Sequence, residues 1–277
     1  MKEKIKFSVL MSVYKKEKAN NLKTAIDSIV NQTLIPNEFI IIEDGPLTSE
    51  LENVLNAYTR KYNWIKTIKL EKNVGLGAAL KEGVLHCNYE YIARMDSDDV
   101  AISNRFQKQI NFLLKHPECD VLGGNIVEFE DLSQKDLLAR KVPIDKNEML
   151  KFLKKRNPMN HVTVIFKKES VLDVGNYLDC PYFEDYYLWV RMLKNDKKLI
   201  NIDETLVRVR AGIEMTNRRG KLEYVKSIIN FENKLYKLGF INYIEYLFNI
   251  TLRSLVAFIP NKIRYYIYQE KLRDETK

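Results

Sequence analysis

The chain has 277 residues, of which 45% are hydrophobic, and this length suffices for one large core or for a core with an appended segment. Lys and Arg number 45 against 37 Asp and Glu, a net charge of +8, and residues 208–277 alone carry +7 of it. The three cysteines, Cys87, Cys119 and Cys180, are odd in number and lack CxxC spacing, which argues against a zinc site and indicates free thiols in a reducing compartment.

The charge distribution and the ends of the chain bear on its location. A basic tail on a nearly neutral body favours an anionic partner, and nucleic acid and anionic lipid both qualify. Residues 1–6 are charged and the apolar run after them is short, so we expect no signal peptide and a cytoplasmic protein. A stretch of about twenty uninterrupted apolar residues is absent from the sequence, so we do not expect a simple transmembrane span.

Strand-like and helix-like segments alternate through the first hundred residues. Short apolar runs are separated by segments whose apolar residues recur at helical spacing. The predicted strands are Phe7–Tyr14, Glu38–Ile42, Ile65–Leu70 and a run beginning at Tyr91, and the predicted helices cover 22–30, 49–62 and the residues up to Val84. This alternation predicts a parallel sheet with right-handed crossovers whose strand ends meet at one edge. Asp44, Asn73 and Asp96/Asp98 should therefore share a crevice.

Three carboxylates end the fourth of these strands. Asp96, Asp98 and Asp99 lie within four positions, and such a cluster is repulsive unless a cation or hydrogen-bond donors neutralise it. Oxygen ligands of this kind suit Mg²⁺ or Mn²⁺ holding a diphosphate. The alternative is that Asp98 or Ser103 merely caps the following helix, but capping needs only one such residue.

The pattern after the acid cluster is less regular. A helix is predicted over 105–113 and a strand over Val121–Phe129, where Gly123 and Gly124 allow close approach of another backbone. The charged segment Asp131–Asn157 is expected to be a surface insertion or a helical loop. His161–Phe166 is predicted to be a strand with a histidine at its start.

A second pair of acids lies among aromatic residues. Leu188, Trp189 and Met192 have helical spacing, which puts Glu184 and Asp185 at a helix N-terminus, where carboxylates are favoured. A favourable interaction with the helix dipole alone would account for the presence of one of these two acids.

The last third combines strands, a basic loop and helices. Strands are predicted at Leu199–Ile202 and Thr205–Val209, and the loop up to Gly220 contains Arg218 and Arg219, which suit phosphate binding or simple solvation. Residues 221–277 are predicted to be helical. The apolar, aromatic and basic residues beyond Gly239 suit either a bilayer interface or packing against the rest of the protein.

Taken together, a metal site, a separate carboxylate pair and a basic loop indicate displacement of a nucleoside diphosphate. One alternative is a nucleotidyltransferase acting on sugar phosphates, but the basic loop after the first strand has no glycine. The other is a non-catalytic nucleic-acid-binding module, which would leave the carboxylates at the sheet edge without a purpose and in a position to repel phosphate.

The set of motifs resembles a family 2 glycosyltransferase of the GT-A fold, and is similar to bacterial capsule, O-antigen and exopolysaccharide enzymes. The resemblance covers roughly residues 5–210 and rests on Ser8–Tyr14, Glu43-Asp44-Gly45, Asn73-Val74-Gly75-Leu76, Arg94–Asp99 and Glu184–Trp189. It implies a Rossmann-like α/β fold with a mixed, mostly parallel sheet, in a catalytic domain over 1–215 with a helical extension over 216–277. It also implies an inverting, metal-dependent hexosyl- or N-acetylhexosaminyltransferase that uses a nucleotide sugar, most often a UDP sugar.

The resemblance also assigns roles to individual residues. Asp98 is expected to bind Mn²⁺ or Mg²⁺, with Asp96 beside it toward the donor, and Asp185 to be the catalytic base assisted by Glu184. Leu80 stands where many relatives have an arginine, so one donor contact is absent or comes from Arg94. The other expected donor contacts are Ser12, Tyr14, Asp44, Asn73, Gly75, Arg218 and Arg219, and the expected acceptor contacts are His161 and Trp189.

The implied partners are a nucleotide sugar and a glycan or lipid-diphosphate-linked saccharide. A basic, apolar tail makes sense if the acceptor lies on a membrane, so we expect peripheral association with the anionic inner face of the cell membrane and no nucleic acid.

Overall fold

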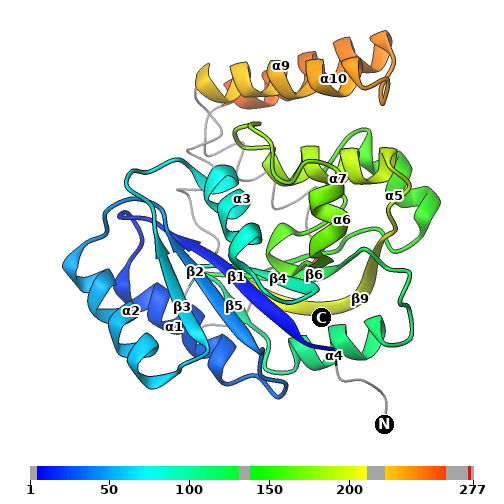
Figure 1. Cartoon of the computed structure of the whole chain (residues 1–277). Helices are drawn as coiled ribbons and strands as arrows, with labels where there is room; N and C mark the ends of the chain where they lie inside the picture. The colour runs from blue at the N-terminus through cyan, green and yellow to red at the C-terminus, as the bar shows by residue number, and fades with distance from the viewer. Residues whose placement is uncertain (1–4, 131–137, 211–221, 260–273, 276–277) are drawn as a thin grey trace.

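The computed structural model describes residues 5–130, 138–210, 222–259 and 274–275. Within these ranges the chain forms a mixed sheet with helices on both faces, and two C-terminal helices lie above the helices of one face (Figure 1). The predicted α/β class is confirmed.

One half of the sheet is parallel and follows the predicted alternation. Its strands are ordered β3-β2-β1-β4 and are joined by helices that cross over the sheet. The elements are β1 (Phe7–Val13), α1 (Ala19–Val30), β2 (Glu38–Glu43), α2 (Ser49–Lys61), β3 (Ile65–Lys69), α3 (Leu76–His86) and β4 (Tyr91–Asp96). In the register of β1, Ser12 lies opposite Asp96 of β4 and opposite Ile42 of β2. The ends of these strands, with Asp44 and Asp96, therefore reach the same edge, as predicted.

Side chains along β1 alternate between two cores because successive residues of a strand point to opposite faces. Val9 and Met11 join the core on the α1 and α2 side, whereas Leu10 joins the core on the α3 side. Leu80 of α3 is fully buried in that second core.

The other half of the sheet is largely antiparallel. β8 (Ile165–Lys167) pairs with β4 and β6 (Val121–Phe129), β7 (Leu138–Arg140) pairs with β6, and the short β5 (Val100–Ala101) pairs with β9 (Leu199–Arg210). Only β9 runs parallel to β6. The helices of this half are α4 (Arg105–Leu113), α5 (Lys146–Leu153), α6 (Lys168–Asp173) and α7 (Glu184–Lys194).

Two details differ from the sequence predictions, and a third agrees with them. The predicted strand His161–Phe166 begins as a 3₁₀ turn, η1 (His161–Thr163), and only its end enters β8. The two strands predicted between 199 and 209 are one strand, β9, with a register shift opposite Gly124 and Asn125. A Cβ on Gly124 would lie 2.9 Å from the backbone carbonyl oxygen of Glu204, so the predicted close approach of another backbone is confirmed.

The C-terminal region is a helical hairpin of α9 (Leu222–Lys237) and α10 (Tyr243–Phe258). Phe231 of α9 is fully buried and stacks on Phe183, next to α7, at 4.6 Å between ring centroids. The hairpin thus shares the core of the α3 face, while the division into domains at 215/216 stays a prediction. Residues 274–275 pair with β7 as β10, so the prediction of helix throughout 221–277 was wrong there. Among the described helices, none has both the length and the apolar character that a membrane span requires.

Candidate functional site

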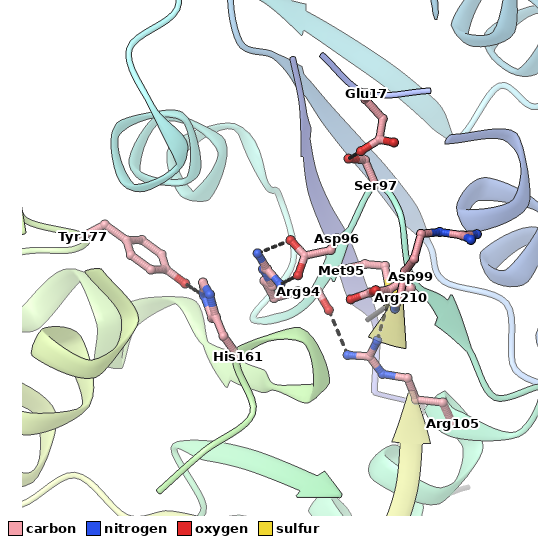
Figure 2. Close-up of polar contacts among 10 residues, drawn as sticks. All are labelled: Glu17, Arg94, Met95, Asp96, Ser97, Asp99, Arg105, His161, Tyr177 and Arg210. Atoms are coloured by element: carbon pink, nitrogen blue, oxygen red, sulfur yellow. Dashed lines mark hydrogen bonds and ion pairs between the residues drawn. The ribbon is translucent and has the colours of Figure 1, made fainter. Parts of the chain in front are cut away.

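The acid cluster lies where β4 leaves the sheet, and its residues have different partners; Figure 2 shows Asp96 and Asp99. Asp96 is held by both terminal nitrogens of Arg94, whose own side chain is buried. Asp99 is buried and accepts a hydrogen bond from the backbone N–H of Arg210 at 2.8 Å. The backbone carbonyl of Asp98 accepts a hydrogen bond from Arg210 Nε at 3.2 Å, so the end of β9 lies against the cluster.

The electrostatics of the cluster suit a cation. Burial, followed by the charges of Asp96 and Glu17, raises the pKa of Asp98 to about 7. Burial and the neighbouring carboxylates Asp98 and Asp96 also raise the pKa of Asp99. A divalent cation would relieve this repulsion, and carboxylate oxygen is the ligand it prefers. In the described part of the chain no three His, Cys, Asp or Glu side chains form a metal-binding group.

Arg94 extends the cluster toward the interior. Its carbonyl accepts a hydrogen bond from Arg105 Nη2 at 2.9 Å, and its buried Nε has no hydrogen-bond partner among the described residues. Burial works against the charge, but the ion pair with Asp96 raises the pKa of Arg94 on balance. Arg94 therefore remains a buried cation beside the carboxylates.

The loop before α3 is fixed by Asp44. Asp44 is buried and its carboxylate accepts hydrogen bonds from the backbone N–H of Val74 at 2.7 Å, from that of Gly75 at 3.1 Å and from Asn73 Nδ2 at 2.9 Å. Gly75 adopts φ +87°, which favours glycine. The structure thus brings Asp44, Asn73 and Gly75 together, and Asp44 shapes this loop in addition to any donor contact. Ser12 and Tyr14 are partly exposed at the end of β1.

Glu184 and Asp185 form the first turn of α7, as predicted. Asn157 Nδ2 donates a hydrogen bond to Asp185 Oδ2 at 2.6 Å. Glu184 packs against α3, because a Cβ on Gly77 would lie 2.5 Å from its Cγ. Burial raises the pKa of both carboxyls, that of Glu184 to about 7, while the Asn157 hydrogen bond and the charges of Arg94 and Arg140 partly oppose the shift at Asp185.

The acid cluster and the carboxylate pair act electrostatically on the same two buried side chains, Arg94 and Tyr177. The charge of Arg94 lowers the pKa of Asp98 and that of Asp185, so both groups lie within its field. Burial raises the pKa of Tyr177, and Asp185, Glu184 and Asp96 add to the shift. His161 Nε2 and the Tyr177 hydroxyl lie 2.8 Å apart (Figure 2). The two predicted sites therefore flank one set of buried side chains.

The predicted acceptor residues lie deeper than expected. Burial, and then the charge of Arg94, lowers the pKa of His161, so the imidazole is neutral. Trp189 is fully buried and meets the His161 ring edge-on at 6.0 Å, so any effect of Trp189 on an acceptor would pass through His161. Arg218 and Arg219 lie outside the described residues.

Sequence reasoning missed Asn157, Tyr177, Glu17 and Arg105. Asn157 ends a charged segment with no clear periodicity, and a single asparagine there carries no signal. Arg105 was assigned only to a helix, although an arginine at a position of the buried helix face would have indicated a buried polar contact.

Known proteins share both the sequence and the fold. The family profile described as "Glycosyl transferase family 2" matches residues 8–174. The chain is 39% identical to the Escherichia coli "UDP-Gal:alpha-D-GlcNAc-diphosphoundecaprenol beta-1,3-galactosyltransferase", over 97% of each chain. It is 35% identical to the Erwinia amylovora "Amylovoran biosynthesis glycosyltransferase AmsE", over 95% of this chain and 98% of the relative.

Two solved structures support the fold at low sequence identity. S. aureus TarS 1–349 in complex with UDP-GlcNAc has a TM-score of 0.64 and 16% identity, over 96% of this chain and 74% of TarS. The mannosyltransferase PcManGT from Pyrobaculum calidifontis, in complex with GDP-Man and Mn²⁺, has a TM-score of 0.64 and 11% identity, over 95% of this chain and 72% of PcManGT.

Proposed function

The chain belongs to glycosyl transferase family 2 and has the GT-A fold, and from this premise we propose that it transfers a sugar from a UDP sugar. The proposed acceptor is a hydroxyl group of a lipid-diphosphate-linked saccharide, and the transfer is a step in the synthesis of a bacterial surface polysaccharide. The Escherichia coli relative is named for a UDP-Gal donor and a diphosphoundecaprenol-linked sugar, and the TarS structure contains UDP-GlcNAc. These names support the donor and acceptor classes.

The observation that carries the proposal is the common position of two groups of acids around Arg94. One group, Asp96 and Asp98, suits a cation and the diphosphate of a donor. The other, Glu184 and Asp185, suits a proton acceptor. Because the charge of Arg94 acts on both Asp98 and Asp185, a donor held at the first group would lie near the base.

The proposed reaction is a single in-line displacement. The acceptor oxygen forms a bond to the anomeric carbon of the donor as the bond from that carbon to the diphosphate oxygen breaks, so the configuration inverts. The proton of the acceptor hydroxyl passes to Asp185, and the nucleoside diphosphate leaves with the bonding electrons. Asn157 fixes the direction of the Asp185 carboxylate, and Glu184 orients the acceptor or shares the proton.

The residues that would hold a cation are Asp98 and Asp96, and a bound Mn²⁺ or Mg²⁺ would neutralise charge on the departing diphosphate. The Mn²⁺ complex of PcManGT supports a divalent ion. We keep Ser12, Tyr14, Asp44, Asn73 and Gly75 as the donor side of the site, together with Arg94. Arg218 and Arg219 stay proposed phosphate contacts.

A lipid-linked acceptor would confine the reaction to a membrane surface, so we place the enzyme on the inner face of the cell membrane. The nucleotidyltransferase and nucleic-acid-binding alternatives are not favoured, because the family match over residues 8–174 includes the acid cluster and the loop held by Asp44.

The test is a panel of nucleotide sugars, each incubated with the full chain, with Mn²⁺, Mg²⁺ or a chelator, and with a short-chain lipid-diphosphate saccharide. We expect one UDP sugar to release UDP and to extend the acceptor in a cation-dependent way. Turnover of a GDP sugar alone would overturn the donor class, and the absence of turnover with every donor would overturn the proposed function.

A further inference from the structure

Helix α10 presents a row of large apolar side chains to solvent. They are between 47% and 77% exposed and recur three and four residues apart along the helix, namely Tyr243, Ile244, Leu247, Phe248, Leu252, Leu255 and Phe258. A helix of 16 residues is about 24 Å long, so this row, which we call the α10 face, runs along most of it. Such a continuous exposed apolar surface indicates an interaction site.

The charged residues of α10 do not interrupt this face. Glu245 binds Lys154 Nζ at 2.9 Å, and Arg253 Nε lies 3.1 Å from Glu232, which is completely buried. Both charges are thus directed to the protein, and the α10 face is apolar.

Lysines of α5 and the residues after it flank this face. Lys151, Lys154 and Lys155 line a groove of about 350 Å³ whose other wall includes Ile244 and Phe248 of the α10 face. Lys151 and Lys155 are exposed. The groove therefore puts ammonium groups beside apolar side chains, which is what the boundary between headgroups and acyl chains requires.

We propose that the α10 face and this lysine groove together form a membrane-docking surface for bilayers that contain anionic phospholipid. The aromatic and aliphatic side chains would enter the acyl boundary, and the lysines would bind headgroup phosphates.

Charge complementarity favours a bilayer over a second copy of the chain. Among the described residues that line the groove Glu245 is the one acid, and Lys154 already binds it. A two-fold dimer through α10 would bring two such lysine groups together without adding acids to the groove. Anionic headgroups supply the missing charge.

The docking surface also lies close to the carboxylates. Arg253 Nη2 is 3.4 Å from the Tyr186 hydroxyl, and Tyr186 follows Asp185 in α7. Helix α10 thus contacts the residue that follows the base. The use of the surface for a lipid-linked acceptor rests on the proposed function, whereas its affinity for lipid does not.

The test is co-sedimentation of the full chain with vesicles of phosphatidylcholine alone and with about one quarter phosphatidylglycerol added. We expect the wild type to bind the anionic vesicles. The affinity of the Ile244→Glu/Leu255→Glu variant for them should be lower by a factor of about ten or more. Leu85→Glu is the matched control, since Leu85 is 53% exposed on α3, and should bind as the wild type does. Thermal stabilisation of each variant by UDP with Mn²⁺ checks that the fold is intact.

A second pair of variants tests the lysines. Lys151→Gln/Lys155→Gln should weaken binding to the anionic vesicles by about tenfold and reduce its salt dependence. Lys23→Gln/Lys81→Gln makes the same change in net charge at exposed lysines elsewhere and should have no such effect.

The proposal is overturned if the wild type does not bind anionic vesicles, or if the α10 variant still binds them. It is equally overturned if the wild type is a dimer that only the α10 variant dissociates, since a second copy would then cover the face. Normal vesicle binding without turnover of any nucleotide sugar would defeat the proposed function and leave the docking surface intact.

Discussion

Asn157 and Asp185, 28 residues apart in sequence, are joined by a hydrogen bond of 2.6 Å from Nδ2 to Oδ2. Asn157 is itself held, because its Oδ1 accepts the backbone N–H of Met159 at 3.2 Å and its carbonyl accepts Arg140 Nη2 at 2.9 Å. One oxygen of the Asp185 carboxylate is therefore held in place.

Removal of this hydrogen bond should change the pH profile. Asn157 favours the charged form of Asp185 and lowers its pKa, so Asn157→Ala should raise that pKa and move the acid limb of kcat/KM to higher pH, with about a tenfold loss at neutral pH. Pre-steady-state and steady-state rates from pH 5 to 9 would measure this. Asn147→Ala, at an exposed position of α5, serves as the control. A parallel drop at every pH would instead mean that Asn157 only supports the fold.

The Asp185→Asn variant should lose transfer by about a thousandfold or more while it still binds UDP with Mn²⁺. An amide keeps the size of the side chain but cannot accept the proton of the acceptor hydroxyl. Radiolabel transfer and calorimetric titration of UDP would separate the two effects. An active Asp185→Asn enzyme would disprove the assignment of the base.

The Asp98→Ala variant should lose cation-dependent binding of the donor. In the wild type, protons compete with the cation because the pKa of Asp98 is raised to about 7, so Mn²⁺-dependent donor affinity should fall as the pH drops through that value. Titration of donor at several pH values with Mn²⁺ or a chelator would measure both effects. Unchanged titration curves in the variant would count against the metal site.

Glu184→Gln should stabilise the protein at high pH. Burial raises the pKa of Glu184 from 4.5 to about 7, so the folded protein holds its proton more tightly than the unfolded chain. Ionisation therefore costs stability as the pH rises from about 4.5 to 7, and the cost is full above pH 7. We expect the variant to gain about 1 kcal/mol relative to wild type at pH 8 and nothing at pH 4, after allowance for partial exposure. Urea unfolding at both pH values would show this difference, and an equal gain at both would contradict it.

Gly77→Ala should lower activity although alanine favours helices by about 1 kcal/mol over glycine. The new methyl group would lie 2.5 Å from Glu184 Cγ and would push that side chain out of place. A double-mutant cycle with Glu184→Ala, which lacks Cγ, isolates the contact, because Gly77→Ala should then have little further effect on kcat/KM. Ala78→Ser, at the exposed neighbouring position, is the control for the helix itself.

The sequence predicted the parallel half of the fold well for a physical reason. Its strands β1, β2 and β4 are buried on both faces and its helices have one apolar stripe, so the two periodicities are strong. The shared edge that holds Asp44 and Asp96 followed from the handedness of the crossovers. The resemblance of separate motifs to one family then assigned Asp185 to the same site.

Other features depend on contacts that no local pattern records. The apolar run from His161 resembles a strand, but the Thr163 hydroxyl donates to the Asn160 carbonyl at 2.7 Å and the chain turns there. Asn157 and Tyr177 act through partners far away in sequence. Likewise, the exposed side of α10 could not be distinguished from its buried side until α9 and α7 were in place.

The α9–α10 hairpin has a mechanical consequence for the base. Asn249 Nδ2 and Arg253 Nη2 bind the carbonyls of Lys154 and Lys155, at 3.0 Å and 2.9 Å, just upstream of Asn157. The hairpin therefore holds in place the backbone segment that carries Asn157, whose side chain binds Asp185. A shortened chain that stops at the predicted boundary of residue 215 would retain Asp96, Asp98, Glu184 and Asp185, yet it would lack the hairpin contacts that hold the segment before Asn157.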